Sequence, residues 1–246
     1  MEKKKKDETA PGEMTFLEHL EELRKRVIHI LIMIIAGFVV CYIFSEQLFH
    51  FLVNPVLSAL PQDKKLVFTS PYQPFAIYIK VAMIMGCFFT FPGILYEAWK
   101  FVAPGLYKNE RRYTLLFVIM TIVFFVGGAL FAYSMVLPYC YKFLIGYGSD
   151  FTPMLTINDA LSSVTWLLFA FGIAFELPVV ILILAKMGIV SLEKLKKGRP
   201  YIILLIVVFA AIITPTPDLV TQTAVAIPMY LLYELSIILI RLFIRK

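Results

Sequence analysis

Two long stretches of the chain carry no charged side chain, and they limit its possible folds more than any other feature. They span residues 28–45 and 114–141, and further apolar runs follow. A helix needs about 20 apolar residues to cross a hydrocarbon core about 30 Å thick. The whole chain is 60% hydrophobic and only 16% charged, whereas soluble domains are about a quarter charged. The sequence therefore predicts an all-α protein that crosses a membrane several times.

The apolar runs predict six transmembrane helices, of which the last two are short. Their approximate ranges are 27–46, 75–97, 113–137, 161–186, 201–214 and 220–240. We expect residues 1–14 to form a disordered basic tail and residues 15–246 to form a single six-helix membrane domain. Segments 47–74 and 138–160 hold several prolines, which break helices, so we predict a structured loop in each.

The basic residues alternate between the two sides of the predicted membrane. Only four of the 23 lie in or beside the connections of one side, namely Lys64, Lys65, Lys80 and Lys142. The others gather near the N-terminus, in loops 98–112 and 186–200, and at the C-terminus. Cytoplasmic loops carry an excess of Lys and Arg, so we expect both termini to be cytoplasmic.

The fifth predicted helix is too short for an ordinary crossing. Its apolar part, residues 201–213, is about 20 Å long at 1.5 Å per residue. The turn with Pro215 and Pro217 should therefore lie within the membrane depth, where irregular backbone is tolerated only against protein or a wet cavity. We expect a locally thinned bilayer or a water-filled recess beside this pair.

Several polar residues fall inside the predicted helices. Glu176 lies in the middle of the fourth, where a charge costs about 2.5–3.5 kcal/mol, so we favour a functional role over a single satisfying hydrogen bond. Asp218 suits an N-cap of the sixth helix. Gln222 and Glu234 could hold helices together by hydrogen bonds, and for Glu234 we favour that structural role.

Acids stand among bases near the start of the chain. Glu18, Glu21 and Glu22 precede Arg24, Lys25 and Arg26, and Glu110 lies in the 98–112 loop. Pairs four residues apart, such as Glu21 with Lys25, indicate ordinary surface pairing. Carboxylates at a membrane surface would also suit a cationic ligand, because a guanidinium matches a carboxylate with two hydrogen bonds.

The sequence carries no recognisable catalytic or metal-binding motif. It lacks the HExxH, GxSxG and P-loop patterns, and its three histidines do not cluster. The three cysteines are isolated. We therefore expect no enzyme, no metal site and no cofactor.

Five segments closely resemble the TatC family of twin-arginine translocase subunits. They occur in the family's order and span residues 14–241; they read HLEELRKRV, YEAWKFVAPGLYKNERR, FGIAFELPVV, KGRPYIIL and TPDLVTQTAVAIPMYLLYE. The resemblance implies a receptor in the cytoplasmic (inner) membrane that binds twin-arginine signal peptides. It also implies export of folded proteins by the proton-motive force, with single-span partners of the TatA and TatB type.

The resemblance also implies a set of functional residues. Those of the signal-peptide-binding face are Glu22, Arg24, Glu110, His19 and Phe101. Glu176, Gln222 and Asp218 match intramembrane polar positions that contact partners, and Pro55 matches a structural proline of the first outer loop.

Two other classes of protein are weighed against this interpretation. A small-solute or ion transporter would predict inverted repeats and several midplane polar groups, but no internal repeat is apparent. An intramembrane enzyme is disfavoured by the missing motifs. We expect contacts with membrane lipids and self-association, and no nucleic-acid partner.

Overall fold

The computed structural model describes residues 16–61, 65–102, 114–148, 150–214 and 218–243, and helices make up most of this part. The helices are α1 (Phe16–Ile43), α2 (Ser45–Leu57), α3 (Gln73–Val102), α4 (Thr114–Phe131), the π-helical η3 (Ala132–Val136), α5 (Leu137–Tyr147), α6 (Ile157–Phe175), α7 (Leu177–Lys186), α8 (Leu192–Ile213) and α9 (Leu219–Phe243). The predicted tail, residues 1–14, lies outside the described residues. Among these, the extended backbone pairs once, at an isolated bridge between Val67 and Thr156.

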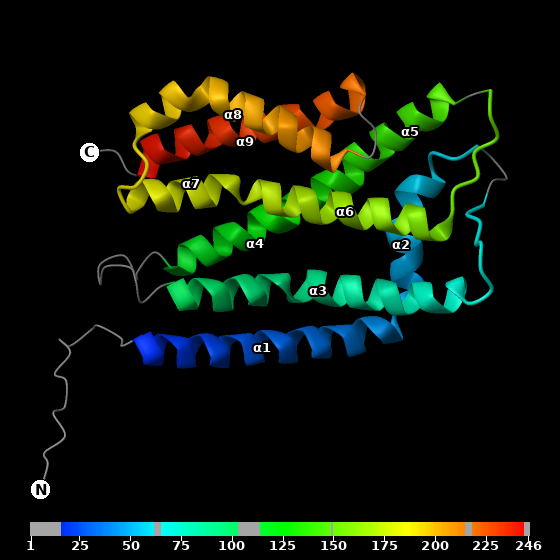
Figure 1. Ribbon diagram of the computed structural model, residues 1–246, viewed down its shortest axis with the longest axis horizontal. Coiled ribbons are helices and arrows are strands. Elements are labelled where there is room, and N and C mark those ends of the chain that lie inside the picture. The colour runs from blue at the N-terminus through cyan, green and yellow to red at the C-terminus, as the bar shows by residue number, and fades with distance from the viewer. Residues whose placement is uncertain (1–15, 62–64, 103–113, 149, 215–217, 244–246) are drawn as a thin grey trace, which may run out of the picture.

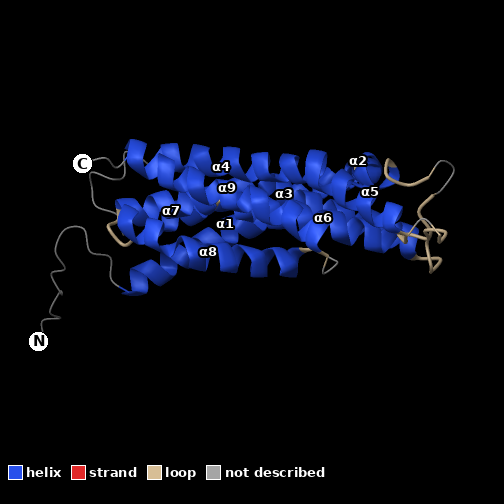
Figure 2. Cartoon of the chain, turned by 90° about the horizontal axis from the view of Figure 1, so that it is seen from above, coloured by secondary structure: helices blue, strands red, loops and turns tan. Residues whose placement is uncertain are grey.

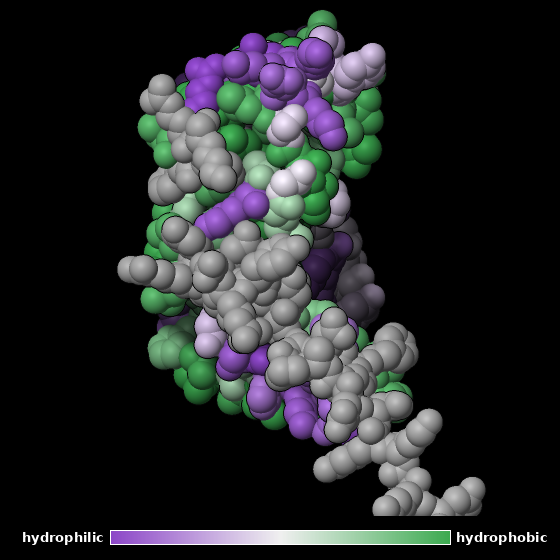
Figure 3. Space-filling view, turned by 90° about the vertical axis from the view of Figure 1, so that its left-hand side faces the viewer, coloured by the Kyte–Doolittle hydropathy of each residue, from purple (hydrophilic) through white to green (hydrophobic). Residues whose placement is uncertain are grey.

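Most helices run along the long axis of the molecule, as Figures 1 and 2 both show. The start of α1, the end of α3, the start of α8 and the end of α9 lie at the left-hand end in Figure 1. Hydrophilic side chains gather on that end and hydrophobic ones cover its flanks (Figure 3). This distribution suits a helical bundle whose sides face lipid and whose end faces water.

Within the described residues, five helical stretches are long and apolar enough to cross a membrane. They are Leu17–Ile43, Gln73–Ala98, Leu115–Tyr147, Ile157–Lys186 and Leu219–Leu242. These correspond to five of the six predicted spans. The remaining one, the fifth predicted span at residues 201–214, lies in α8, whose first eight residues hold the charged run from Glu193 to Arg199. A crossing by α8 and the cytoplasmic placement of the termini remain predictions.

Segment 47–74 is not a loop throughout, because α2 runs to Leu57 with Pro55 inside it. A proline leaves the carbonyl four residues earlier without its helical donor. Here that carbonyl belongs to Phe51, and the Tyr133 hydroxyl donates to it at 2.7 Å. The loop prediction failed at this point because a distant side chain replaces the hydrogen bond that Pro55 removes.

The prediction of a loop from residue 138 is also wrong, because the helix continues to Tyr147. Residues 132–136 form a π-helical turn that ends two residues before Pro138, and the Leu137 N–H donates to the Ala132 carbonyl. A π turn inserts an extra residue and changes which carbonyls need donors. The wider turn therefore accommodates Pro138 without ending the helix.

The fourth predicted span is interrupted at Glu176. Helix α6 ends at Phe175 and α7 begins at Leu177, with Pro178 in the first turn of α7. The interruption places Glu176 at the end of one helix and the start of another.

The backbone around the last two helices is tied down by side chains. The Trp166 indole donates to the Ile213 carbonyl at 3.0 Å. The Thr214 hydroxyl donates to the Ala210 carbonyl at 3.0 Å. These bonds satisfy carbonyls at the end of α8, as buried backbone in a membrane requires. In Figure 1, α8 ends and α9 begins short of the right-hand end that α3 and α6 reach.

Helices α1 and α3 pack against each other with almost no space between their backbones. A Cβ added at Gly86 would lie 2.7 Å from the Phe38 backbone nitrogen, and one at Gly37 would lie 2.9 Å from the Gly86 carbonyl oxygen. Only glycine allows so close an approach. Because the two helices are antiparallel, this contact brings the start of α1 beside the end of α3 (Figure 1).

Candidate functional site

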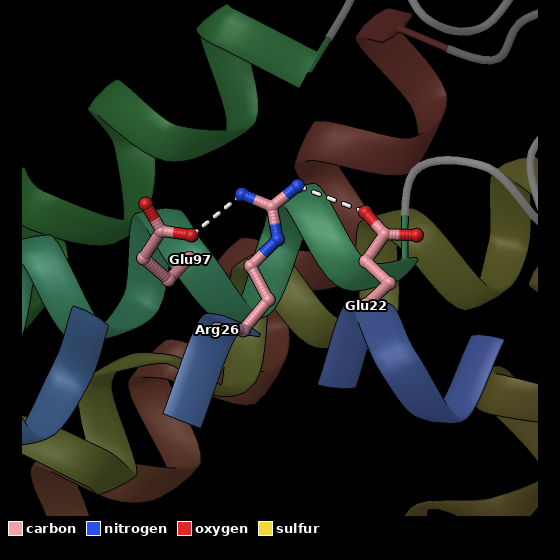
Figure 4. A network of polar contacts seen from close by, with 3 residues as sticks. All are labelled: Glu22, Arg26 and Glu97. Atoms are coloured by element: carbon pink, nitrogen blue, oxygen red, sulfur yellow. Dashed lines mark hydrogen bonds and ion pairs between the residues drawn. The ribbon is translucent and has the colours of Figure 1, made fainter. Parts of the chain in front are cut away.

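The candidate site lies where the start of α1 meets the end of α3. Arg26 of α1 contacts two carboxylates there, one from each helix (Figure 4). Its Nη2 atom donates to Glu22 Oε1 at 2.8 Å, and its Nη1 atom donates to Glu97 Oε2 at 2.6 Å. The three side chains are only 13–17% exposed. Charge-assisted hydrogen bonds of this kind are stronger than neutral ones.

The second oxygen of Glu22 has a different environment. It is buried and accepts no hydrogen bond from any described residue. In Figure 4 it points away from Arg26. A buried carboxylate oxygen without a donor costs about 1–3 kcal/mol or more, so Glu22 retains unused capacity to accept a hydrogen bond.

A hollow of about 690 Å³ adjoins these residues. Its lining is almost entirely charged and consists of Glu18, Glu21, Glu22, Lys25, Arg26, His29 and Lys100. The Lys25 ammonium pairs with Glu21 at 2.9 Å, but both side chains are about two thirds exposed. Both predicted pairs, Glu21–Lys25 and Glu22–Arg26, are therefore confirmed, and only the second is largely buried.

Three of the predicted face residues lie together at this end. His19 and Phe101 stack with ring centroids 4.3 Å apart and planes 16° apart, one helical turn from Glu22 on α1. Arg24 is exposed on α1, and the described lining of the hollow does not include it. Glu110 lies outside the described residues.

The sequence analysis did not identify Glu97 as a site residue. It follows an apolar run and stands 71 residues from Arg26, so neither local spacing nor a motif joins the two. The available signal was a carboxylate at the end of a predicted span, opposite the acids and bases that begin the first span. Antiparallel packing of those two spans would have brought the groups together.

Glu176 lies at the α6–α7 junction in contact with α4. Its Oε1 atom and the Thr121 hydroxyl of α4 are both buried without a hydrogen bond to any described residue. The Thr121 side chain lies close enough to interact with the Glu176 carboxylate. Thr121 is therefore the polar neighbour of Glu176, across the contact between α4 and the α6–α7 junction.

The other three predicted polar residues of the last helix pair make hydrogen bonds within α9 or between α8 and α9. Asp218 caps α9, because its Oδ1 atom accepts from the Thr221 N–H at 2.8 Å. Gln222 donates to the Val207 carbonyl of α8 at 3.0 Å. Glu234 binds Arg199 at 2.7 Å and accepts from the Tyr230 hydroxyl at 3.0 Å. The expected cap and the expected structural bonds between helices are thus present.

Comparison with known proteins identifies the family. The family model described as "Sec-independent protein translocase protein (TatC)" matches residues 18–228. A protein of that name from Koribacter versatilis is 47% identical over 227 residues, which cover 91% of this chain and 84% of the relative. The protein of that name from Escherichia coli is 38% identical and covers 94% of this chain and 89% of its own length.

A solved structure gives the same result for the fold. The crystal structure described as the twin arginine translocase receptor TatC superposes with a TM-score of 0.79 at 40% sequence identity. The match covers 93% of this chain and all of that one. The chain therefore belongs to the TatC family, and it is a multi-pass membrane component of a Sec-independent protein translocase.

Proposed function

We propose that this protein is the core receptor subunit of a twin-arginine translocation system and that the α1–α3 face binds twin-arginine signal peptides. The observation that carries the proposal is the state of Glu22. One of its oxygens already binds the guanidinium of Arg26, and the other is buried without a described donor. A carboxylate in this setting suits a second guanidinium, which can donate two parallel hydrogen bonds.

The remaining residues of the proposed face have separate roles. Glu22 and Glu110 accept the two arginines of the peptide. The stacked rings of His19 and Phe101 offer a flat surface beside Glu22 on which a peptide side chain can lie. Arg24 stays in the set because of the family resemblance alone.

The hydrophobic part of the signal peptide would then bury itself between helices. The charged pair fixes the register of the peptide, and apolar burial supplies most of the affinity. On the lipid-facing side of α1, Leu31 is 53% exposed and Ile35 is 61% exposed. Faces of this kind provide area for lipids, for a signal helix, or for single-span partners of the TatA and TatB type.

The intramembrane acid Glu176 serves transport in this proposal. Asp218 and Gln222 already make bonds that stabilise α8 and α9. Glu176 keeps a buried oxygen without a described donor, so it is the better candidate for a polar contact with a partner helix. The complex works in the cytoplasmic (inner) membrane, with both termini cytoplasmic and with the proton-motive force as its energy source. Self-association of the chain is part of the proposal.

Membership of a translocase family disfavours the alternative of a small-solute or ion transporter. The test uses a signal peptide with a photo-crosslinker beside its two arginines, added to native membranes. We expect crosslinks to the residues that line the hollow, and we expect a matched twin-Lys peptide to give few. Equal crosslinking of both peptides, or crosslinks only elsewhere on the chain, would overturn the proposal.

A further inference from the structure

Arg26 places the chain's own guanidinium on the carboxylate that we assign to the peptide's arginine. The further inference rests on that proposed function and concerns how the site selects its ligand. Arg26 reaches Glu22 and Glu97 through different nitrogens, Nη2 and Nη1. One of the two contacts can therefore break while the other persists.

The charges of the three side chains favour a second cation. One guanidinium serves two carboxylates, so Glu22, Arg26 and Glu97 together carry a net charge of −1. All three are largely buried, and a largely buried charge that loses its partner is strongly destabilising. If Arg26 left Glu22 without Glu97 beside it, its own charge would have no partner in this cluster.

We propose that Arg26 is an internal competitor for Glu22 and that Glu97 retains Arg26 when a ligand guanidinium takes its place. In the unliganded protein Arg26 spans both carboxylates (Figure 4). On binding, the ligand guanidinium occupies Glu22, including the oxygen that accepts no described hydrogen bond, while Arg26 keeps its 2.6 Å contact with Glu97. Both carboxylates and both guanidiniums are then paired.

This exchange makes Arg26 and Glu97 specificity-determining residues. A ligand must bind Glu22 better than Arg26 does. A guanidinium can do so because it presents two donors in the plane of the carboxylate, whereas a lysine ammonium is a compact, strongly hydrated charge. The internal competitor lowers the apparent affinity of every cation by the same factor, so lysine, which binds Glu22 more weakly, is the first to lose measurable binding.

The test compares four forms of the full chain in lipid membranes: wild type, Glu97→Gln, Arg26→Gln and the double variant. Binding of a twin-Arg peptide and of a matched twin-Lys peptide is measured for each. Glu97→Gln leaves Arg26 on Glu22 alone and should weaken twin-Arg binding about tenfold, because one charge-assisted hydrogen bond no longer retains the competitor. Arg26→Gln should strengthen binding of both peptides by a similar factor, so that twin-Lys binding also becomes measurable.

The double variant separates the competitor from a simple structural tie between α1 and α3. Without Arg26 there is no competitor for Glu97 to retain, so the double variant should bind twin-Arg like Arg26→Gln. If the triad only fastened the helices, the double variant would bind as weakly as Glu97→Gln or more weakly. That result would overturn the inference, as would an Arg26→Gln protein that binds both peptides no more strongly than wild type.

Two control variants test whether a change of charge alone alters peptide binding. Glu193→Gln and Lys196→Gln make the same charge changes on exposed positions of α8, at the same end of the molecule, and should not alter binding. Arg26→Met removes the charge but retains an unbranched apolar side chain. It is used in place of Arg26→Gln if thermal unfolding shows that Arg26→Gln is unstable. A wild type without preference for twin-Arg over twin-Lys overturns the proposed function as well. A preference with the wrong double-variant result overturns only the exchange.

Discussion

Glu22 and Glu176 are the two acidic residues that hold a buried oxygen without a described hydrogen-bond donor. A buried carboxylate oxygen without a donor lowers the stability of the fold, and replacing the acid by an apolar side chain would remove this loss of stability. The two acids lie at different depths, Glu22 at the polar end of the bundle and Glu176 between α6 and α7. We therefore assign them different tasks, Glu22 in ligand recognition and Glu176 in transport.

Replacing Glu176 should separate those tasks. Glu176→Ala should strongly reduce export of a folded reporter protein and leave binding of a twin-Arg peptide within about twofold, because the change lies far from the polar end. Export in cells and peptide crosslinking in membranes measure the two properties. Thr165→Ala, a change in α6 at a hydroxyl that bonds only within its own helix, is the control. Equal loss of export and binding in Glu176→Ala would instead indicate a structural role.

Pro55, Pro138 and Pro178 are three of the prolines in the described helices, and the chain accommodates each of these by a different local arrangement. The Tyr133 hydroxyl replaces the donor lost at Pro55, a π turn precedes Pro138, and the helix breaks at Glu176 before Pro178. In a membrane no bulk water can satisfy the freed carbonyls, so each arrangement must come from the protein. The Tyr133 bond fastens α2 to the segment that links α4 and α5.

Removing that hydroxyl should cost stability. Tyr133→Phe leaves the Phe51 carbonyl without its donor and should lower the free energy of unfolding by about 1–3 kcal/mol. In a Pro55→Ala background the same change should cost less, because an alanine has the backbone N–H that the proline lacks. Tyr139→Phe removes the hydroxyl of an exposed tyrosine on α5 and is the matched control. Equal losses in both backgrounds would show that Tyr133 does not compensate for Pro55.

The contact between α1 and α3 should control the site from a distance. Gly86→Ala would place a methyl group 2.7 Å from the Phe38 backbone nitrogen, so α1 must shift. Overpacking of this kind costs about 1–3 kcal/mol and should move Arg26 away from Glu97, which weakens peptide binding. Gly127→Ala has no atom within 4 Å of the new methyl group and serves as the control. Unchanged binding in Gly86→Ala would show that the triad does not depend on this contact.

The sequence predicted the apolar helices better than their ends. Long charge-free runs identify membrane helices directly, so five of the six predicted spans correspond to observed helices. Helices α2 and α5 were predicted as loops because a proline is a local signal, whereas Tyr133 lies 82 residues from Phe51 and the π turn has no simple pattern. Glu97 was missed for the same reason, because its importance arises only from packing of α3 on α1.

The molecule as a whole has one strongly polar end, which holds the start of α1 and the start of α8 (Figure 3). The excess of Lys and Arg on that side predicts that it faces the cytoplasm. The opposite end carries few basic residues, among them Lys142 of α5. This orientation determines which compartment can deliver a ligand to the hollow.

Labelling of single cysteines tests the orientation. Lys142→Cys should react with an impermeant thiol reagent in intact cells, whereas Lys196→Cys should react only after the membrane is opened, because both side chains are exposed at opposite ends. The native Cys41 and Cys140 are buried, and the half-buried Cys87 is first replaced by Ser. The reverse pattern of reaction would contradict the predicted topology and the placement of the site.

The central claim is that Glu22 accepts a guanidinium from the ligand, and an equilibrium binding measurement tests it most directly. Twin-Arg and twin-Lys peptides are titrated against the full chain in lipid nanodiscs, as wild type, Glu22→Gln and the control Glu193→Gln. We predict that wild type and the control prefer the twin-Arg peptide, and that Glu22→Gln loses this preference with an affinity at least about tenfold lower. A Glu22→Gln protein that remains folded and binds the twin-Arg peptide with undiminished preference would contradict the claim.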